Sequence, residues 1–341
     1  MKNNKKTVKN RRWDILGIGS PLLDIVININ DKMLQKLNIK KGSMNLISEK
    51  ESRNILKKLG KIKLGLVPGG SASNTLAGLS ALGNQASFLG VVGKDGYGKM
   101  YQKKIEKEGI VSHLACHDSG MTGNVIVLIT PDGERTMVTH LGAALSFEKK
   151  HIKEDEIKNC KILHIEAYQL ESPNNRRALL HAIKIAKKNK ALISMDLSDA
   201  GLIRRNKKIF KDVVKKYIDV VFANEDEAME FSGKKNPAEA LKEIAKICKI
   251  AVVKLGAKGS LIKQGKKVFE IQPYKVDLIN TNGAGDTYAA GILHGLINGL
   301  KLQDAGKIAS HISALVVSSL GARLDKKHFS LIKKYKVHPV K

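Results

Sequence analysis

The feature that most constrains the fold is a regular alternation of short apolar runs with longer amphipathic segments after residue 150. The apolar runs, which we expect to be strands, lie at 162–165, 192–195, 220–222 and 250–254. The segments between them have helical periodicity and lie near 174–188, 203–217 and 225–248. Strands joined by helices form a parallel sheet that is covered on both faces. The pattern therefore predicts an α/β fold with a central, mostly parallel sheet and helices on either side.

The same signals appear earlier and later in the chain. Further strands are expected at 15–18 and 86–91, and further helices at 48–59, 73–82 and 97–108. Ser48 and Glu51 have the spacing of a capping box at the start of a helix. A hairpin at 260–271 and two helices near 284–298 and 302–320 complete the expected fold.

One stretch in the first half predicts a small separate sheet. Residues 124–130 and 135–140 flank Pro131-Asp132-Gly133, which is typical of a hairpin turn. Together with strands near 24–29 and 43–47, this hairpin predicts a β lid built from about 24–47 and 112–141. We expect one domain over 13–330, a disordered basic tail at 1–12 and a basic C-terminal tail at 331–341.

The segment Asn282-Gly283-Ala284-Gly285-Asp286 carries the clearest chemical signal. It precedes an apolar helical run, so backbone N–H groups and the positive end of a helix dipole would face an anion there. An aspartate beside such a site can take a proton from a hydroxyl while the N–H groups stabilise a transferring phosphoryl group. Spacing alone also fits a glycine-rich turn in which Asp286 is an ordinary first-turn acid.

Several other functions are disfavoured. The chain lacks GxxxxGK[ST], so it has no P-loop, and Gly17-x-Gly19 lacks the third glycine of a dinucleotide fingerprint. The widely separated Cys116, Cys160 and Cys248 form no CxxC pair, which favours three reduced thiols over a zinc site or disulfides. No apolar run approaches the ~20 residues that cross a bilayer. The basic start lacks the apolar core of a signal peptide, so a cytoplasmic protein without membrane contact is expected.

The formal net charge of +28 invites a nucleic-acid-binding interpretation. However, only nine of the 60 basic residues are Arg, and the lysines are spread over the whole chain. Specific recognition of phosphates and bases favours clustered Arg. The charge therefore indicates a solvated lysine-rich surface and no specific nucleic-acid partner.

Three segments, taken together, resemble the signatures of a known family. Gly69-Gly70-Ser71-Ala72-Ser73-Asn74, Asn224-Glu225-Asp226-Glu227 and Asn282-Gly283-Ala284-Gly285-Asp286 are similar, in order and spacing, to those of the PfkB carbohydrate kinase (ribokinase) family. The resemblance runs from about Asp14 to Leu324. Within the family, Gly17-Ile18-Gly19-Ser20-Pro21-Leu22-Leu23-Asp24 most resembles the adenosine-kinase branch. Thr130-Pro131-Asp132-Gly133-Glu134-Arg135-Thr136-Met137 resembles bacterial members named adenosine or sugar kinase.

The resemblance implies a ribokinase-like fold and a phosphotransferase that uses ATP and Mg²⁺. It implies that Asp286 is the base that deprotonates the acceptor hydroxyl. Gly283, Ala284 and Gly285 would form the anion hole for the phosphoryl group.

For the acceptor, the resemblance implies hydrogen bonds to sugar hydroxyls from Asp24, Gly70 and Asn74. A carboxylate suits a diol because it accepts two hydroxyl hydrogens. Ser20 stands where the adenosine-kinase pattern usually has Asn, and its hydroxyl would also bind ribose. Adenosine is the first candidate acceptor, and the alternative is a sugar such as ribose, fructose or a keto-deoxy sugar.

For the nucleotide, the resemblance implies that Asn224 and Glu227 orient Mg²⁺ through waters near the ATP phosphates, without a protein-only metal site. Their i, i+3 spacing equally fits an N-cap and its capping-box partner. Lys254, Gly256 and Gly259 resemble the nucleotide-side loop of the family, although many members have Thr in place of Lys254.

One position departs from the pattern of the family. Asn280 stands where many members have an Asp associated with a monovalent cation, so K⁺ dependence is not expected from the motif. A monomer or a homodimer is expected. A kinase-like protein that binds ligand without catalysis is disfavoured by the intact Gly-Ala-Gly-Asp segment.

Overall fold

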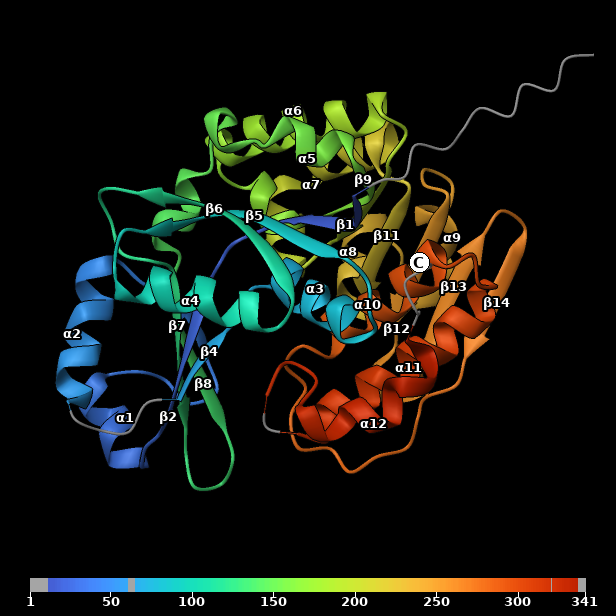
Figure 1. Ribbon diagram of the computed structural model, residues 1–341. Helices are drawn as coiled ribbons and strands as arrows, with labels where there is room; N and C mark the ends of the chain where they lie inside the picture. Colours follow the sequence, from blue (N-terminus) through green and yellow to red (C-terminus); the bar gives the residue numbers. More distant parts are fainter. Residues whose placement is uncertain (1–11, 61–64, 320, 337–341) are drawn as a thin grey trace, which may run out of the picture.

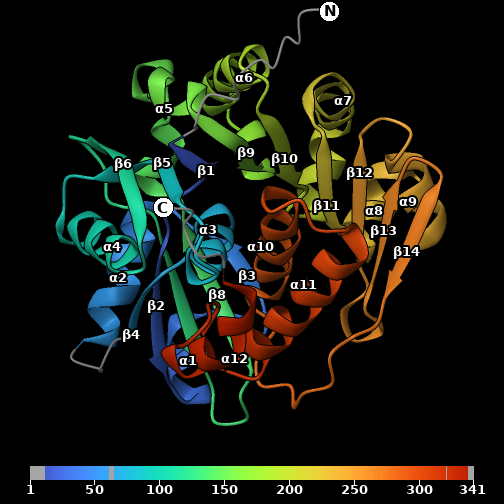
Figure 2. The same cartoon turned by 45° about the vertical axis from the view of Figure 1, so that its right-hand side comes forward.

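The computed structural model describes residues 12–60, 65–319 and 321–336, and it places them in a large layered α/β unit and a smaller sheet (Figures 1 and 2). Of the tails expected at 1–12 and 331–341, residues 1–11 and 337–341 lie outside the described residues. The chain does not become a tail at residue 331. Residues Phe329–Ile332 form α12, and the side chain of Ile332 is fully buried.

Among the described residues, the large sheet has nine strands in the order β14-β13-β12-β11-β10-β9-β1-β5-β6. Their bounds are Trp13–Ile18 (β1), Ala86–Gly93 (β5), Ile110–His117 (β6), Cys160–Glu166 (β9), Leu192–Asp196 (β10), Val220–Asn224 (β11), Ile250–Lys254 (β12), Ser260–Gln264 (β13) and Lys267–Ile271 (β14). Every pair from β6 to β12 is parallel, and only the β12–β13 and β13–β14 pairs are antiparallel. The predicted mostly parallel sheet and its terminal hairpin are confirmed.

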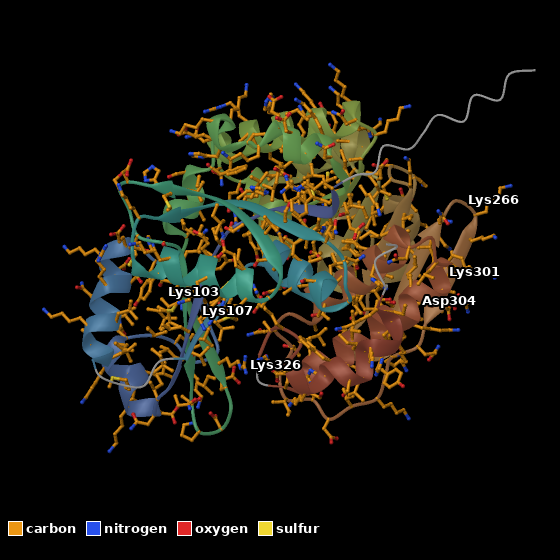
Figure 3. All side chains as sticks on the ribbon, viewed as in Figure 1. Lys103, Lys107, Lys266, Lys301, Asp304 and Lys326 are labelled. Atoms are coloured by element: carbon orange, nitrogen blue, oxygen red, sulfur yellow. The ribbon has the colours of Figure 1, made fainter. Side chains whose placement is uncertain are left out.

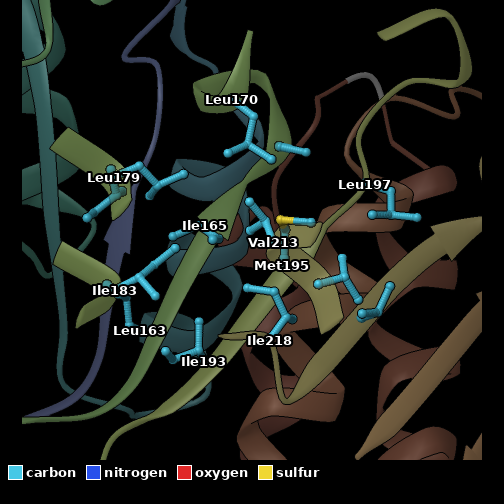
Figure 4. Packing of buried hydrophobic residues seen from close by; sticks show 14 of the residues in the cluster. Leu163, Ile165, Leu170, Leu179, Ile183, Ile193, Met195, Leu197, Val213 and Ile218 are labelled. Carbon is cyan, nitrogen blue, oxygen red and sulfur yellow. The ribbon is translucent and has the colours of Figure 1, made fainter. Parts of the chain in front are cut away.

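Helices cover both faces of this sheet (Figure 2). One face carries α3 (Ser71–Ala81), α4 (Gly96–Lys107), α10 (Ala284–Ile297) and α11 (Leu302–Val317). The other carries α5 (Glu154–Lys158), α6 (Pro173–Lys188), α7 (Ala200–Tyr217), α8 (Glu225–Ser232) and α9 (Pro237–Ile244). Figure 4 shows the second core, where Leu163, Ile193 and Met195 of the strands meet residues such as Leu179 of α6 and Val213 of α7. Burial of aliphatic side chains on both faces is the main stabilising contribution.

The single helical segment expected at 225–248 is two helices. Gly233 has a left-handed conformation (φ 78°) and ends α8. Asn236 then caps α9 by accepting a hydrogen bond from the Glu239 N–H, and Pro237 is the first residue of that helix. Glycine after a helix and proline at a helix start are strong boundary signals, and they outweigh the continuous apolar periodicity here.

The smaller sheet has the strand order β3-β8-β7-β2-β4 in the described part of the chain. The bounds are Leu23–Asn28 (β2), Met44–Leu46 (β3), Gly65–Pro68 (β4), Asn124–Ile129 (β7) and Arg135–His140 (β8). Helices α1 (Asp31–Leu37) and α2 (Glu49–Leu59) pack on one face and enclose a small core of their own. The capping box of Ser48 and Glu51 at the start of α2 is confirmed.

The boundaries of this sheet differ from the prediction at two places. Residues 112–117 belong to β6 of the large sheet, because β6 pairs in parallel with β5 along its whole length. Strand β4 was missed; it pairs antiparallel with β2 and leads directly into α3. The sheet therefore connects, through β4, to the helix that carries Ser71 and Asn74.

Glycines let α10 and α11 approach each other closely. A methyl group built on Gly291 of α10 would lie 2.4 Å from Ala309 Cα of α11. One built on Gly295 would lie 2.3 Å from Ala305 Cβ. The close approach fixes the position of α10, whose first turn contains Asp286.

In the described residues, no helix combines the length and the apolar character that crossing a bilayer requires. Cys116, Cys160 and Cys248 are all free thiols, and Cys160 is buried. The expectation of three reduced thiols stays a prediction.

Candidate active site

The polar ends of four neighbouring parallel strands lie side by side at one edge of the large sheet. Strands β9, β10, β11 and β12 end at Glu166, Asp196, Asn224 and Lys254. The register pairs Glu166 with Asp196 and Asn224 with Lys254. In open α/β sheets, ligands bind beyond these carboxyl ends. The candidate site is therefore formed by these residues, the first turn of α10 and the start of α3.

Asp286, the third residue of α10, is held by two side chains of α3. Ser71 Oγ donates a hydrogen bond to Asp286 Oδ1 at 2.7 Å, and Asn74 Nδ2 donates to Oδ2 at 2.9 Å. Burial raises the pKa of Asp286, and the charge of Asp196 adds to this effect. The bonds from Asn74 and Ser71 oppose it. The arrangement is a fixed carboxylate with raised basicity, which is what a general base requires.

The turn before Asp286 has the backbone of an anion site. Gly283 has φ +75°, and a methyl group on it would lie 2.0 Å from the Ala322 carbonyl oxygen, so only glycine fits. The first N–H groups of a helix lack intrahelical acceptors. The Ala284 N–H donates to the Thr281 carbonyl at 3.3 Å, and no such bond from the N–H groups of Gly285 and Asp286 is found among the described residues, so these two groups are available to an anion. The role of Gly283, Ala284 and Gly285 as an anion hole stays a prediction, and this geometry supports it.

Asp24, on β2, lies close to Asp286 across the site. A methyl group on Gly69 would lie 2.4 Å from Asp24 Oδ1, so the glycine leaves room for the carboxylate. Gly70 has φ +90° and lies against the Ser20 carbonyl oxygen. Burial raises the pKa of Asp24 to about 7, against the lowering effect of Arg323 and Arg135. The structure brings together Asp24, Gly70 and Asn74, and the acceptor-binding role that the resemblance implies for them stays a prediction.

Ser20 is 8% exposed and is bonded mainly within the protein. Its N–H donates to Glu166 Oε1 at 2.7 Å, and its hydroxyl accepts from Gln169 Nε2 at 2.8 Å. Glu166 also accepts from the Ala72 N–H at 3.1 Å, which ties the start of α3 to the end of β1. Glu166 was not predicted from the sequence, although a charged residue at the end of a buried strand is a visible signal. Contact between Ser20 and an acceptor stays a prediction.

Arg323, another residue that sequence analysis missed, sets the orientation of Asn74. Its Nε donates to Asn74 Oδ1 at 2.9 Å, and its Nη2 donates to Ser73 Oγ at 2.8 Å. Its Nη1 forms an ion pair with Glu108. Arginine only donates, so Asn74 must turn its carbonyl oxygen toward Arg323 and its NH₂ group toward Asp286.

Asn224 and Glu227 form a complete capping box at the start of α8. Asn224 Oδ1 accepts from the Glu227 N–H at 2.8 Å, and the two Glu227 oxygens accept from the N–H and Nδ2 of Asn224, each at 2.8 Å. Burial, followed by the charge of Asp196, raises the pKa of Glu227 to about 7. The alternative interpretation of this pair as a helix cap is therefore confirmed. A role with Mg²⁺ stays a prediction.

The donor set at this edge fits a metal ion held through water rather than by the protein alone. Both Glu227 oxygens are already bonded to Asn224. In the part of the chain that the structure describes, no group of three or more His, Cys, Asp or Glu side chains is placed to hold a metal ion. Mg²⁺ commonly keeps several waters and binds through one or two carboxylates together with substrate phosphates.

The side chain of Lys254 bonds to Asp196, whereas the two glycines predicted to act with it lie in the next turn of the chain. Its side chain is 15% exposed, and Nζ lies 2.8 Å from Asp196 Oδ2. Gly256 and Gly259 have φ +56° and +89°, and they form the turn that leads into β13. Asp196, the partner of Lys254, was not identified from the sequence.

Asn280 links the turn before α10 to the segment after α11. Its Nδ2 donates to the Gly321 carbonyl at 3.2 Å, and its Oδ1 accepts from the Asn282 N–H at 2.9 Å. The amide therefore joins two segments at a position where a carboxylate would lack the donor. The expectation that K⁺ is not required stays a prediction.

The fold and this site are those of a kinase for small molecules, and the comparison with known proteins agrees. Residues 38–328 match the family model of the pfkB family carbohydrate kinase, and the chain belongs to this family. It is therefore a phosphotransferase with an alcohol group as acceptor. The predicted family and the ribokinase-like fold are confirmed.

The similar proteins include both adenosine kinases and 5-dehydro-2-deoxygluconokinases. Adenosine kinase 2 of Arabidopsis thaliana is 27% identical, over 92% of this chain and 96% of its own length. The 5-dehydro-2-deoxygluconokinase of Clostridium perfringens (strain ATCC 13124) is 29% identical, over 84% of this chain and 86% of its own. The crystal structure of adenosine kinase from Sinorhizobium meliloti superposes with a TM-score of 0.86 and 29% identity, over 94% of this chain and 99% of that one.

Proposed function

We propose that this protein transfers the γ-phosphoryl group of ATP to a hydroxyl of a nucleoside, with adenosine as the first candidate. The observation that carries the proposal is the position of Asp286. Its carboxylate is fixed by Ser71 and Asn74 in the first turn of α10, directly beside the N–H groups that face an anion. Base and phosphoryl site are thus held by one rigid element.

Each group at the site has a distinct task in this proposal. The Asp286 carboxylate accepts the proton of the acceptor hydroxyl as its oxygen bonds to phosphorus. The anion hole stabilises charge on the phosphoryl group, since phosphoryl transfer depends mainly on positioning and electrostatics. Asp24 accepts hydrogen bonds from the hydroxyls of the acceptor, together with Gly70, Asn74 and Ser20.

On the nucleotide side, the turn at Gly256 and Gly259 allows the backbone to approach ATP. Asn224 and Glu227 would orient the waters of Mg²⁺, which, when bound to the phosphates, neutralises their charge. The small sheet would close over the acceptor and exclude water, a competing phosphoryl acceptor.

A sugar or sugar-acid acceptor is the second candidate, and the name of the Clostridium relative supports it. The motif at Gly17 to Asp24 favours a nucleoside, because it resembles the adenosine-kinase branch. Both acceptors present a diol that Asp24 can bind, so the two candidates share the same chemistry at the reacting hydroxyl.

The test is a screen of ATP consumption with adenosine, other nucleosides, ribose, fructose and keto-deoxy sugar acids. We expect adenosine to give the highest kcat/KM, and D286N to lower kcat with the best acceptor by about 10²–10⁴-fold, which is the usual contribution of a positioned base. A decrease of less than about tenfold would exclude Asp286 as the base. A keto-deoxy sugar acid as the best acceptor would replace adenosine but leave the role of Asp286 intact.

For the assembly state, we propose a monomer or a homodimer. Strand β3 is an edge strand of the small sheet, and its Met44 and Leu46 side chains are 62% and 66% exposed. An exposed apolar edge can pair with a second copy. Light scattering coupled to size exclusion would report a larger assembly if the proposal is wrong.

A further inference from the structure

The lysine that ends β12 points its ammonium group toward the anion hole. A methyl group built on Gly285 would lie 2.9 Å from Lys254 Nζ, which places the ammonium directly beside the backbone of this residue. The nearest side-chain atoms to that methyl group all belong to Lys254. Gly285 therefore leaves the space into which Lys254 extends, and a side chain there would displace the ammonium.

The ammonium still has donors to offer at this position. Lysine carries three N–H donors, and Asp196 Oδ2 accepts one of them at 2.8 Å. No other hydrogen bond of Lys254 Nζ is found in residues 12–60, 65–319 and 321–336. Two N–H donors therefore remain for a ligand at the Gly285 side of the group.

The group also keeps its charge. Burial by itself would lower the pKa of Lys254, but the charges of Asp196 and Glu227 outweigh this effect, and the pKa lies above its ordinary value. The negative charge of Asp286 acts in the same direction. A largely enclosed cation thus lies among carboxylates, beside the backbone of the predicted anion hole.

We infer that Lys254 is a catalytic residue, whose ammonium donates a hydrogen bond to the transferring phosphoryl group while Asp196 positions it. The inference rests on the proposed function. In the step itself, the acceptor oxygen bonds to the γ-phosphorus as the bond from that phosphorus to the β,γ-bridging oxygen breaks, which releases ADP. The hydroxyl proton passes to Asp286. Lys254 neither gains nor loses a proton; it stabilises the charge on the oxygens of the phosphoryl group.

A purely structural role for Lys254 makes a different prediction. In that case the lysine only neutralises buried Asp196, and it becomes dispensable once Asp196 is neutral. The two roles separate in a set of three variants: K254M, D196N and D196N/K254M. Methionine keeps most of the length of the side chain, and the double variant removes both charges of the Lys254–Asp196 pair together.

We expect K254M to lower kcat by about 10²-fold, the usual cost of removing one donor from such a hole, with the KM for the acceptor changed by less than about threefold. The kcat of D196N/K254M should likewise be ~10²-fold lower than the kcat of D196N. Thermal unfolding shows whether each variant is folded. A double variant within about threefold of D196N would overturn the inference.

A matched control is available at the other end of β12. Lys249 forms an ion pair with Asp219 at 2.9 Å, and its side chain is 74% exposed. K249M removes a more exposed lysine–aspartate pair of the same strand without touching the anion hole. It should leave kcat and both KM values unchanged, so a loss equal to that of K254M would show a general effect of the substitution.

A binding measurement tests the contact without turnover. By calorimetry, K254M should lose affinity for the triphosphate analogue AMP-PNP by about tenfold more than for ADP, because the lost hydrogen bond is to a charged γ-phosphoryl group. An equal loss for both nucleotides would contradict the contact. This result stands whether or not adenosine is the acceptor, and it is separate from the effect of D286N on turnover.

Discussion

The proposed function gives the carboxyl groups of Asp24 and Asp286 separate tasks, and pH should distinguish them. The pKa of Asp24 is raised to about 7, so this group is protonated below that pH and loses its capacity to accept two hydroxyl hydrogens. We expect kcat/KM for the acceptor to fall by about tenfold per pH unit on the acid side of pH ~7. A pH profile measured at saturating ATP would report it.

The variant D24N tests the assignment of that acidic limb. Its kcat/KM should be low and should lack the limb that Asp24 causes near pH ~7, since that group is gone. E227Q is the matched control, because Glu227 also has a pKa of about 7 but lies on the nucleotide side. Identical acidic limbs in wild type and D24N would show that Asp24 does not bind the acceptor.

Arg323 should affect the acceptor site through both its hydrogen bonds and its charge. R323M removes the bonds to Asn74 and Ser73 together with a charge that lowers the pKa of Asp24. We expect a loss of about 2–4 kcal/mol in the free energy of unfolding, as for other buried hydrogen-bonded networks. We also expect the acidic limb of kcat/KM to move to higher pH.

Two further variants separate these effects of Arg323. R323K keeps the charge but cannot bond both partners in the same geometry, so its acidic limb should stay in place while kcat falls. R53M breaks an exposed ion pair with Glu49 on α2 and should change neither property. If R323M and R323K shift the limb equally, the charge of Arg323 is not the cause.

At the residue scale, the sequence predicted the parts of the site that lie in contiguous motifs. Asp286 was singled out by the glycines that precede it, and Asn74 by the resemblance of residues 69–74 to a family signature. Arg323 was not predicted to belong to the site, because it lies 249 residues from Asn74 in the sequence and no spacing rule connects the two residues. Asp196 and Glu166 follow buried strands, but only the strand order shows that they reach the same edge.

At the element scale, the packing of α10 against α11 should control the site. Gly to Ala in an open helix normally stabilises by ~1 kcal/mol. At Gly291 the new methyl group would lie 2.4 Å from Ala309 Cα, so G291A should instead destabilise by ~1–3 kcal/mol. Denaturant unfolding measures the change in stability, and kcat should fall as α10 shifts Asp286.

G96A is the control, because nothing lies within 4 Å of a methyl group at that position. An unchanged stability of G291A would contradict the role of this close contact.

The elements themselves were largely predictable where one periodicity dominates. Strand β12 and the strand–helix alternation follow from apolar patterning and from parallel pairing. Strand β4 was missed because Gly65–Pro68 is short, contains both Gly and Pro, and is defined by its pairing with β2 rather than by its own sequence. Strand β6 was assigned to the wrong sheet because pairing partners are not encoded locally.

At the scale of the whole molecule, the positive charge should act on ATP and not on a neutral acceptor. Lysines extend from elements as far apart as α4 (Lys103 and Lys107), the β13–β14 turn (Lys266) and the segment after α11 (Lys326), as Figure 3 shows. Such a field attracts anions over a range set by salt, because the Debye length falls from ~30 Å at ~0.01 M to ~8 Å at ~0.15 M. We expect the KM for ATP to rise about threefold or more over that range of salt. The KM for adenosine should stay constant, and equal changes for both substrates would show that the charge is not responsible.

The hydrogen bond between Arg323 and Asn74 also has a consequence for biosynthesis. During translation, the acceptor side around Asn74 emerges long before the base at Asp286, and the arginine that orients Asn74 emerges later still. Contacts between residues so distant in the chain form late, because their loop-closure entropy must be overcome first. We therefore expect a chain that stops before Arg323 to lack the fixed orientation of Asn74, so the proposed phosphoryl-transfer centre forms only after residue 323 has been synthesised and folded into place.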